Sequence, residues 1–314
     1  MATHEQPVRK SCSEHPVRPD ETPLVSIGLP VYNGERYLGK ALDALLAQDY
    51  ECFELIISDN ASTDSTAEIC RAYQAKDKRI RYFRNESNLG SVKNFSRVLD
   101  LSTGKYFMWA AHDDLWEPDC INRLVFCLEQ NPEFVLCASD VNFIDANGHL
   151  LRVESLHRID IDISWARARK LFFQYPTSEV LHTIYGLYRT EYLKRCEAPT
   201  LNGRGFLESG ETPILAELAT MGGICAVPHA LKSYRVHADS NYRKELKTKT
   251  KLDHLLISLD VVRKLLVIVN RSNLDAYDKV VLVNTIVCSW VRSFVRAVGR
   301  RFIATVQSWR EGQA

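Results

Sequence analysis

Short apolar runs alternate with segments of helical periodicity through the first half of the chain. The runs are typical of buried strands and lie at 24–29, 54–57, 80–83, 106–111 and 134–138. Segments with apolar residues at helical spacing follow them, at 37–48, 66–74, 91–101 and 118–130. Strands that alternate with helices of this length indicate βαβ units and therefore a mostly parallel sheet.

The second half begins with turn and strand signals and ends in long helices. Residues 145–148, Asp-Ala-Asn-Gly, are typical of a hairpin turn and predict antiparallel strands there. Helical patterns then lie at 164–174, 190–195 and 211–221, and short strand patterns at 183–188, 225–227 and 230–236. From about residue 244 the chain is rich in Leu, Val, Lys and Arg and lacks strand signals. We therefore predict a flexible extension at 1–22, an α/β domain at 23–240 and a C-terminal helical region at 241–314.

Composition narrows the class of protein only modestly. The 314 residues suffice for one large domain with an appendage, and 46% hydrophobic with 25% charged residues is typical of soluble globular proteins. A net charge of +1 gives no overall basic surface for nucleic acid. The nine cysteines form no CxxC pair, and a signal peptide is lacking, which favours reduced thiols in the cytoplasm. No run approaches the ~20 apolar residues of a membrane span.

Two clusters of acidic residues follow directly after predicted strands. Asp59 and Asp64 follow the second strand, and His112-Asp113-Asp114 follows the fourth. The carboxyl ends of parallel strands share one edge of a sheet, where ligands bind. Like charges at that edge repel unless a cation or a donor-rich ligand separates them. A divalent metal that holds a diphosphate, beside a nucleoside held by hydrogen bonds, would meet this requirement.

Each of these motifs also has a structural interpretation. Asp64 suits a helix N-cap, and the second cluster suits a polar loop before the next helix. The Asn33-Gly34 pair after the first strand allows a close approach to a ligand but also serves as an ordinary turn. A GxGxxG run is lacking at this turn, which counts against a dinucleotide-binding enzyme.

The motifs PVYNGERYL, SDNASTDST, NESNLGSVKN and GKYFMWAAHDDLWEPD, in this order, resemble the family 2 glycosyltransferases of bacterial polysaccharide pathways. The resemblance covers roughly residues 24–240. It implies the GT-A fold, an α/β fold with a central, mixed, mostly parallel sheet flanked by helices, here with a C-terminal helical extension. It also implies an inverting transfer from a UDP-, dTDP- or GDP-sugar, with Mg²⁺ or Mn²⁺, to a hydroxyl of a glycan or lipid-linked saccharide.

The same resemblance assigns residues to the donor nucleotide. Pro30, Tyr32 and Asp59 would lie around its base, and Asn88 and Gly90 would line the same cleft. These assignments come from the family's motifs and not from the spacing alone.

The resemblance also assigns the metal and diphosphate site. Asp113 and Asp114 match the DxD-type motif, although Ala111 occupies its first acidic position in this chain. Asp113 would bind the metal directly, Asp114 would hold the metal and the diphosphate, and His237 would add a metal or phosphate contact. Arg235 would neutralise the diphosphate leaving group.

A carboxylate must take the proton from the attacking hydroxyl in an inverting transfer. Glu211 fits the spacing of the family's catalytic base, and Glu208 is the competing candidate. The alternative for Glu211 is an acidic residue that only stabilises the start of a helix.

Other interpretations stay open from the sequence. A sugar-phosphate nucleotidyltransferase shares the general architecture, and a non-catalytic nucleotide-sugar-binding homologue would explain Ala111. The basic and aromatic C-terminal helices suit packing, an oligomer, or a helix lying on the inner face of the membrane. No nucleic acid partner is expected.

Overall fold

The computed structural model describes residues 22–156, 159, 172–173, 182–196, 211–237 and 250–292. In these ranges one nine-stranded sheet runs through the molecule in the order β3-β2-β1-β4-β8-β6-β9-β5, with β7 paired to β6. The strands are β1 (Val25–Val31), β2 (Phe53–Asp59), β3 (Ile80–Arg84), β4 (Tyr106–Trp109), β5 (Leu115–Trp116), β6 (Phe134–Ile144), β7 (Leu150–Glu154), β8 (Leu187–Arg189) and β9 (Gly223–Arg235). The helices are α1 (Leu38–Leu46), α2 (Thr66–Gln74), α3 (Ser91–Asp100), α4 (Cys120–Gln130), α7 (Thr190–Arg195), α8 (Glu211–Met221), α10 (Lys251–Arg271) and a helix at 276–292.

The N-terminal half of the sheet is parallel, as the alternation of strands and helices predicted. β1 pairs in parallel with both β2 and β4, and β2 pairs in parallel with β3. β8 is antiparallel to β4 and to β6, whereas the long pairing of β6 with β9 is again parallel. The sheet is therefore mixed and mostly parallel, and the predicted GT-A architecture is confirmed.

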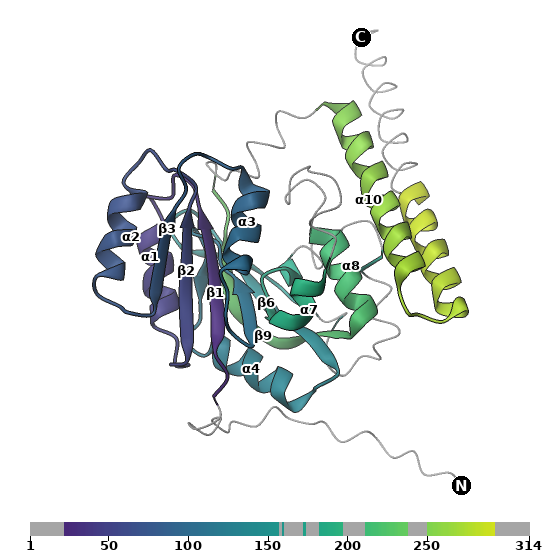
Figure 1. Ribbon diagram of the computed structural model, residues 1–314, viewed down its shortest axis with the longest axis horizontal. Helices are drawn as coiled ribbons and strands as arrows, with labels where there is room; N and C mark the ends of the chain where they lie inside the picture. Colours follow the sequence, from purple (N-terminus) through teal and green to yellow (C-terminus); the bar gives the residue numbers. More distant parts are fainter. Residues whose placement is uncertain are drawn as a thin grey trace, which may run out of the picture.

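Helices cover both faces of the sheet (Figure 1). One hydrophobic cluster joins α1, α2 and α4 to one face, and a second joins α3, α7, α8 and α10 to the other. Alternate residues of β1 divide between them: Ile27 and Leu29 belong to the α1 side, while Gly28 faces Val98 of α3. This alternation is the side-chain period of a strand buried on both faces.

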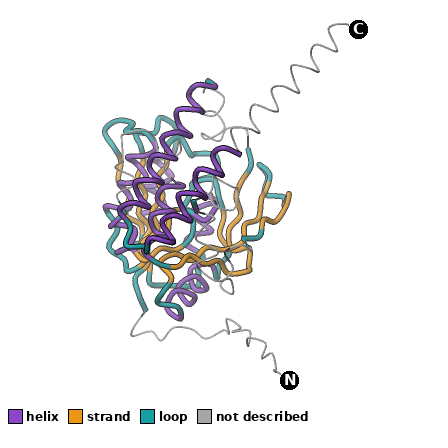
Figure 2. Tube along the Cα trace, turned by 90° about the vertical axis from the view of Figure 1, so that its right-hand side faces the viewer, coloured by secondary structure: helices purple, strands orange, loops and turns teal. Residues whose placement is uncertain are grey.

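The C-terminal helices pack on the α8 side of the sheet and do not stand apart from it. Val261, Leu265 and Ile268 of α10 share the hydrophobic cluster of Leu218 in α8. The helix at 276–292 lies beside α10 (Figure 2), where Trp290 Nε1 donates to Ser258 Oγ at 3.4 Å. Apolar side chains on the outer face of this pair remain exposed: Leu255, Leu256, Leu259, Val280, Val283, Val287 and Val291. None of the described helices is long and apolar enough to cross a membrane.

The first strand does not stop at Pro30 as predicted, because β1 continues through Val31. The main-chain oxygen of Gly28 accepts from Ala110 N, so position 30 also faces the β4 side of the strand. β4 has already ended at Trp109, and the N–H that Pro30 lacks therefore has no strand to bond on that side. A proline is tolerated in a central strand under this condition.

The predicted strands at 225–227 and 230–236 are one strand, β9, with an irregularity in the middle. Val227 is the partner of Ser139 and Ala230 is the partner of Asp140, so Pro228 and His229 are extra residues that bulge out of the ladder. Both are exposed, which interrupts the apolar pattern and made one strand look like two.

Other boundaries also differ from the predictions. β6 extends to Ile144, and its hairpin with β7 forms at the predicted turn, where Gly148 has φ 101°. Of the strand predicted at 183–188 only β8 forms, because residues 182–185 make a helical turn first. The helix predicted at 164–174 lies outside the described residues apart from 172–173, and α7 and α8 lie where predicted.

Candidate active site

The two acidic clusters lie at the same edge of the sheet. β1, β2 and β4 run parallel, so their carboxyl ends share that edge. Asp59 is the last residue of β2, and the loop that carries Asp113 and Asp114 follows β4 directly. The sequence therefore placed both clusters correctly relative to the sheet.

Gly34 lets the loops after β1 and β4 touch. A β-carbon at this position would lie 2.7 Å from Cδ2 of His112 and 2.7 Å from Cγ2 of Val31. A side chain at this position would therefore force His112 or Val31 to shift. The close approach that the Asn33-Gly34 pair permits is made to the neighbouring loop, which carries Asp113.

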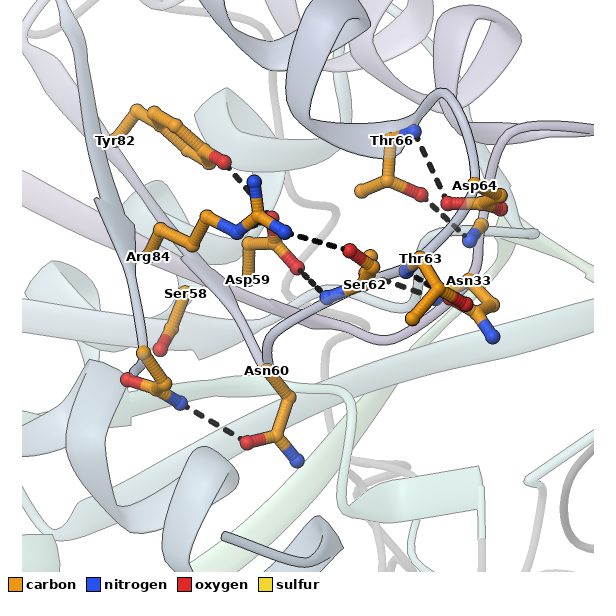
Figure 3. Close-up of polar contacts among 12 residues, drawn as sticks. Asn33, Ser58, Asp59, Asn60, Ser62, Thr63, Asp64, Thr66, Tyr82 and Arg84 are labelled. Carbon is orange, nitrogen blue, oxygen red and sulfur yellow. Dashed lines mark hydrogen bonds and ion pairs between the residues drawn. The ribbon is translucent and has the colours of Figure 1, made fainter. Parts of the chain in front are cut away.

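A set of main-chain and side-chain hydrogen bonds joins the loop after β1 to the loop after β2 (Figure 3). Asn33, with φ 51°, donates its N–H to Ser62 Oγ at 2.9 Å and accepts from Thr63 N at 2.8 Å. Glu35 donates its N–H to Asp64 Oδ2 at 3.1 Å. These bonds fix the two loops relative to each other, so the edge of the sheet is preformed.

Asp64 lies one residue before Ser65, the N-cap of α2, so it contacts the start of this helix without being the N-cap that the capping interpretation predicted. Its Oδ1 accepts from Thr66 N at 3.0 Å. Burial acts to raise the pKa of Asp64, but hydrogen bonds from Thr66 and Glu35 outweigh it and hold the pKa below its ordinary value. Asp64 therefore has a structural role that accounts for its position.

Asp59 is fully buried, and both of its carboxylate oxygens have partners. Oδ1 accepts from Ser62 N and Oδ2 accepts from Tyr82 Oη, each at 2.8 Å (Figure 3). Arg84 Nε lies 3.6 Å from Oδ2, and Arg84 Nη2 donates to Ser62 O at 2.7 Å. Burial and the Asp59 carboxylate raise the pKa of Tyr82, which keeps its phenol protonated as a donor. The carboxylate thus holds the half-exposed Arg84 over this loop.

Asparagines connect the tip of β2 to the start of α3. Asn60 donates from Nδ2 to Asn88 Oδ1 at 2.8 Å, and its Oδ1 accepts from Asn85 Nδ2 at 3.0 Å and from Leu89 N at 2.8 Å. Asn94 of α3 accepts from Asn85 Nδ2 at 3.1 Å. A buried amide network of this kind fixes a loop because each member loses its partners if the loop moves.

The remaining residues assigned to the donor nucleotide surround the same loops. Pro30 is buried at the end of β1, and Tyr32, just beyond it, is half-buried. Asn88 and Gly90 are exposed where α3 begins, and Asn88 Oδ1 accepts from Gly90 N at 2.9 Å. Gly90 has φ 82°, a backbone conformation that favours glycine.

The two aspartates after β4 have different surroundings. Asp113 Oδ2 lies 2.8 Å from His237 Nε2, and 17% of the Asp113 side chain is exposed. Asp114 is 1% exposed, with its Oδ2 2.8 Å from Lys232 Nζ and its Oδ1 accepting from Arg235 N at 3.0 Å. Only Asp113 therefore presents its carboxylate to the outside.

The pKa values of Asp113 and Asp114 shift in opposite directions. Burial raises the pKa of Asp114, aided by the charge of Asp113 and opposed by the ammonium of Lys232. Burial also acts to raise the pKa of Asp113, but the hydrogen bond from His237 outweighs it and the pKa is lowered. Asp113 is therefore the carboxylate that stays ionised most readily.

Arg235 is buried and its guanidinium connects loops within the protein. Nε donates to Asp113 O at 2.8 Å, and Nη1 donates to the main-chain oxygens of residues 145 and 146 at 3.2 and 3.3 Å. The ring of Tyr37 stacks 4.8 Å from this guanidinium and 4.8 Å from the ring of His237. Arg235 therefore ties the β6–β7 hairpin to the Asp113 loop.

Glu211 is the first residue of α8, and its side chain lies outside the described residues, as does Glu208 altogether. α8 leads into β9 with only Gly222 between them.

Three important side chains were not predicted from the sequence. Lys232 pairs with Asp114, Tyr37 packs on Arg235, and Arg84 pairs with Asp59. A lysine inside the apolar stretch of β9 was the available signal, since a buried charge needs a partner. Tyr37 and Arg84 carry no such signal because aromatic and basic residues are common at element ends.

The fold and site define a class of protein, the GT-A transferases, in which a sheet edge of this kind lies beside an acidic loop. Residues 26–196 match the family model described as glycosyl transferase family 2. That match covers more than half of the chain, and the chain belongs to this family.

Similar proteins carry glycosyltransferase names. An uncharacterized glycosyltransferase of Haemophilus influenzae is 26% identical over 231 residues, 70% of this chain and 68% of that protein. An uncharacterized glycosyltransferase of Methanocaldococcus jannaschii is 34% identical over 134 residues, 42% of this chain and 46% of that protein. An uncharacterized glycosyltransferase of Rickettsia bellii is 37% identical over 131 residues, which is only 19% of its length.

Solved structures share the fold at low sequence identity. S. aureus TarS 1–349 aligns with a TM-score of 0.64 at 17% identity, over 88% of this chain and 73% of that one. The mannosyltransferase PcManGT from Pyrobaculum calidifontis, in complex with GDP-Man and Mn²⁺, aligns with a TM-score of 0.56 at 16% identity, over 94% and 82%. At these identities the likeness concerns the fold.

Proposed function

We propose that this chain transfers a sugar from a nucleotide-sugar donor to a hydroxyl of a glycan or lipid-linked acceptor, with inversion at the anomeric carbon. The observation that carries the proposal is the preformed edge of the sheet. There the loops after β1, β2 and β4 are fixed to one another, and of the two aspartates after β4 only Asp113 keeps its carboxylate partly exposed. Structures of proteins with this fold contain UDP, UDP-GlcNAc, or GDP-Man with Mn²⁺, which supports a nucleotide-sugar donor and a divalent cation.

The loops after β1 and β2 suit the nucleoside. Pro30, Tyr32, Asn88 and Gly90 line its cleft in this proposal. Asp59 has no free carboxylate oxygen, so we assign it the role of holding Arg84 and the Ser62 loop at the base. Asp59 therefore belongs to the base site by positioning its neighbours.

The residues beside Asp113 fit a divalent cation. Its carboxylate is partly exposed, and His237 Nε2 lies beside it, 2.8 Å from Oδ2. A carboxylate oxygen is a hard ligand that suits Mg²⁺ or Mn²⁺, which would neutralise charge on the donor diphosphate, and His237 would add a contact there. Asp114 supports this site from behind, since Lys232 and Arg235 N already occupy its oxygens.

The leaving diphosphate would gain charge as the bond to the anomeric carbon breaks. Arg235, Lys232 and His237 lie directly behind Asp113 and place positive charge or donors at this end of the site. Arg235 acts there as a positioning residue, because its bonds to the hairpin and to Asp113 O hold the loop in place. On the acceptor side, Glu211 would take the hydroxyl proton as the oxygen attacks, with Glu208 as the competitor.

A donor panel tests the proposal. UDP-, GDP- and dTDP-sugars are added with Mn²⁺, and the thermal midpoint and the release of nucleoside diphosphate are measured. We expect one donor class to raise the midpoint and to be hydrolysed slowly, because ligands that bind only the folded state stabilise it. Failure of every donor to bind and to be hydrolysed would refute the proposal.

Two controls sharpen this experiment. Asp113→Asn should remove the Mn²⁺-dependent part of donor binding, whereas Asp100→Asn, at an exposed position at the end of α3, should leave it unchanged. Pyrophosphate release from a sugar phosphate and a nucleoside triphosphate would instead identify a nucleotidyltransferase. Binding of a donor without any turnover toward acceptors would favour a non-catalytic homologue.

A further inference from the structure

Three cysteines from different elements converge in the core below the active-site edge. Cys127 lies on α4, Cys137 on β6 and Cys225 on β9. Their Sγ atoms all lie within 4.8 Å of one another, and those of Cys127 and Cys225 are 3.7 Å apart. Each residue is at most 1% exposed. Among the described residues, these three thiols are the group whose atoms could together bind a soft ion. They are separate from the donor site.

Topology explains why the three thiols meet. Cys137 and Cys225 are register partners on the parallel neighbours β6 and β9, so their side chains point to the same face of the sheet. α4 covers that face, with Leu124, Cys127 and Leu128 in the same hydrophobic cluster. Cys127 on α4 lies over Cys137 and Cys225, so the helix supplies the third thiol of the cluster.

The triangle has the dimensions of a three-coordinate thiolate site. Three atoms within 4.8 Å of one another have a common centre no more than about 2.8 Å from each. A thiolate bond of about 2.3 Å would place three sulfurs that are coplanar with a metal about 4.0 Å apart, and in the pyramid around a trivalent centre with a lone pair the sulfurs lie closer together than that. The Sγ atoms of Cys127 and Cys225 are 3.7 Å apart and no pair is more than 4.8 Å apart, so the three thiols must draw together to bind one such centre. Small side-chain movements would therefore suffice to form three bonds to one centre.

The apolar surroundings of the three cysteines favour a bound centre that leaves the whole site without net charge. The cluster lies among Leu124, Leu128 and Leu187, and besides one another its thiols approach the main-chain oxygens of Leu136 and Ala138, at 3.8 and 3.6 Å. A net charge buried in such surroundings is costly. Three thiolates around a monovalent or divalent ion keep a net negative charge, whereas three thiolates around a trivalent centre are neutral.

We propose that Cys127, Cys137 and Cys225 form a binding site for trivalent arsenic, which enters as arsenous acid. In this reaction As(OH)₃ and three thiols give As(SR)₃ and three molecules of water, so three As–S bonds replace three As–O bonds. Arsenic stays trivalent throughout and no net proton is released.

The test uses the full chain with sodium arsenite as the probe. The protein is incubated with arsenite when folded and, separately, is refolded from urea in its presence, so that access to the core does not limit binding. Native mass spectrometry should show one arsenic in place of three hydrogens, and the thermal midpoint should rise because α4, β6 and β9 become linked. When the arsenite-treated chain is then unfolded in urea, three of its nine thiols should be protected from a thiol reagent.

Matched serine variants decide the site. Cys225→Ser and Cys127→Ser should lose the adduct and the rise in thermal midpoint, and both are checked for folding by their own melting curves. Cys70→Ser, at a fully buried cysteine of α2 outside the cluster, should behave like the unchanged chain. An unmodified mass in both arms, an adduct that survives Cys225→Ser, or loss of only two hydrogens as in a disulfide would each overturn the proposal.

Discussion

The residues at the sheet edge divide by whether their charges already have partners. Asp59 and Asp114 are buried and their carboxylate oxygens have partners within the protein, whereas Asp113 is open on one side. Adjacent acids in a sequence are therefore not interchangeable in the fold. The local motif supplies two carboxylates, and Lys232 on a distant strand determines which of them remains open.

The buried pair of Lys232 and Asp114 should be important for stability. Lys232→Met would leave Asp114, 1% exposed, without its cation, and loss of one partner of a buried pair costs about 3–5 kcal/mol. Urea unfolding measures this loss. Lys105→Met, which removes an exposed partner of Glu129, should change stability by less than about 1 kcal/mol. An equal loss of unfolding free energy in the two variants would show that the buried pair contributes no more to stability than the exposed pair.

Glu211 is tested by separating binding from turnover. Glu211→Gln keeps the size of the side chain but removes its ability to take a proton, so transfer to an acceptor should fall by at least about 100-fold while donor affinity stays the same. Glu208→Gln is the matched variant. Unchanged transfer in Glu211→Gln, with loss in Glu208→Gln, would assign the base to Glu208.

At the scale of elements, α3 depends on a glycine in the central strand. A β-carbon on Gly28 would lie 2.7 Å from Cγ2 of Val98 and 2.8 Å from Cζ of Phe107, so no space exists for it. Gly28→Ala should lower the free energy of unfolding by about 1–3 kcal/mol through overpacking. The same substitution at Gly39 of α1 meets only Tyr73 Oη, at 3.6 Å, and should be neutral or stabilising by up to about 1 kcal/mol. Comparable thermal midpoints for the two variants would contradict this packing argument.

Element boundaries were predictable where local signals decide them. The helix α2 begins where the sequence predicted, and the turn at 145–148 forms with Gly148 at positive φ. In α3, Ser91 suits an N-cap by its residue type but is the first helical residue, and Gly90 is the N-cap. The bulge at Pro228 and His229 was not predictable, because it depends on the register of β9 against β6. Short strands such as β5 carry too few residues to show a period and form only because β9 lies beside them.

At the scale of the whole molecule, a half-buried histidine, His182, makes stability depend on pH. Burial, and then the charge of Lys232, lower the pKa of His182 to about 4 from its ordinary 6.5. Its ring packs against Phe143 and Tyr234 at 5.0 and 5.2 Å. The unfolded chain binds a proton here at a higher pH than the folded one. The stabilisation is therefore complete above pH 6.5 and is lost as the pH falls from 6.5 toward 4.

His182→Phe should remove this dependence. From pH 7.5 to pH 5 the unchanged chain should lose about 2 kcal/mol through this histidine, and the variant should be spared that part of the loss. Urea unfolding at both pH values measures the difference. His229→Gln, at an exposed position, should follow the unchanged chain. An equal loss in His182→Phe would show that other groups carry the acid sensitivity.

The sequence by itself determined the layered α/β architecture, the edge at which ligands bind and the positions of Asp59 and Asp113 on that edge. Strand and helix periods, turn residues and the parallel connection rule are local properties, so they can be read along the chain. Only the tertiary structure decided which charges remain free. Lys232, Arg235 and His237 reach the Asp113 loop from more than a hundred residues away, and their ion pairs and hydrogen bonds depend on the register of β9. The convergence of three cysteines has the same origin, because strand pairing and helix packing bring together residues that no local pattern connects.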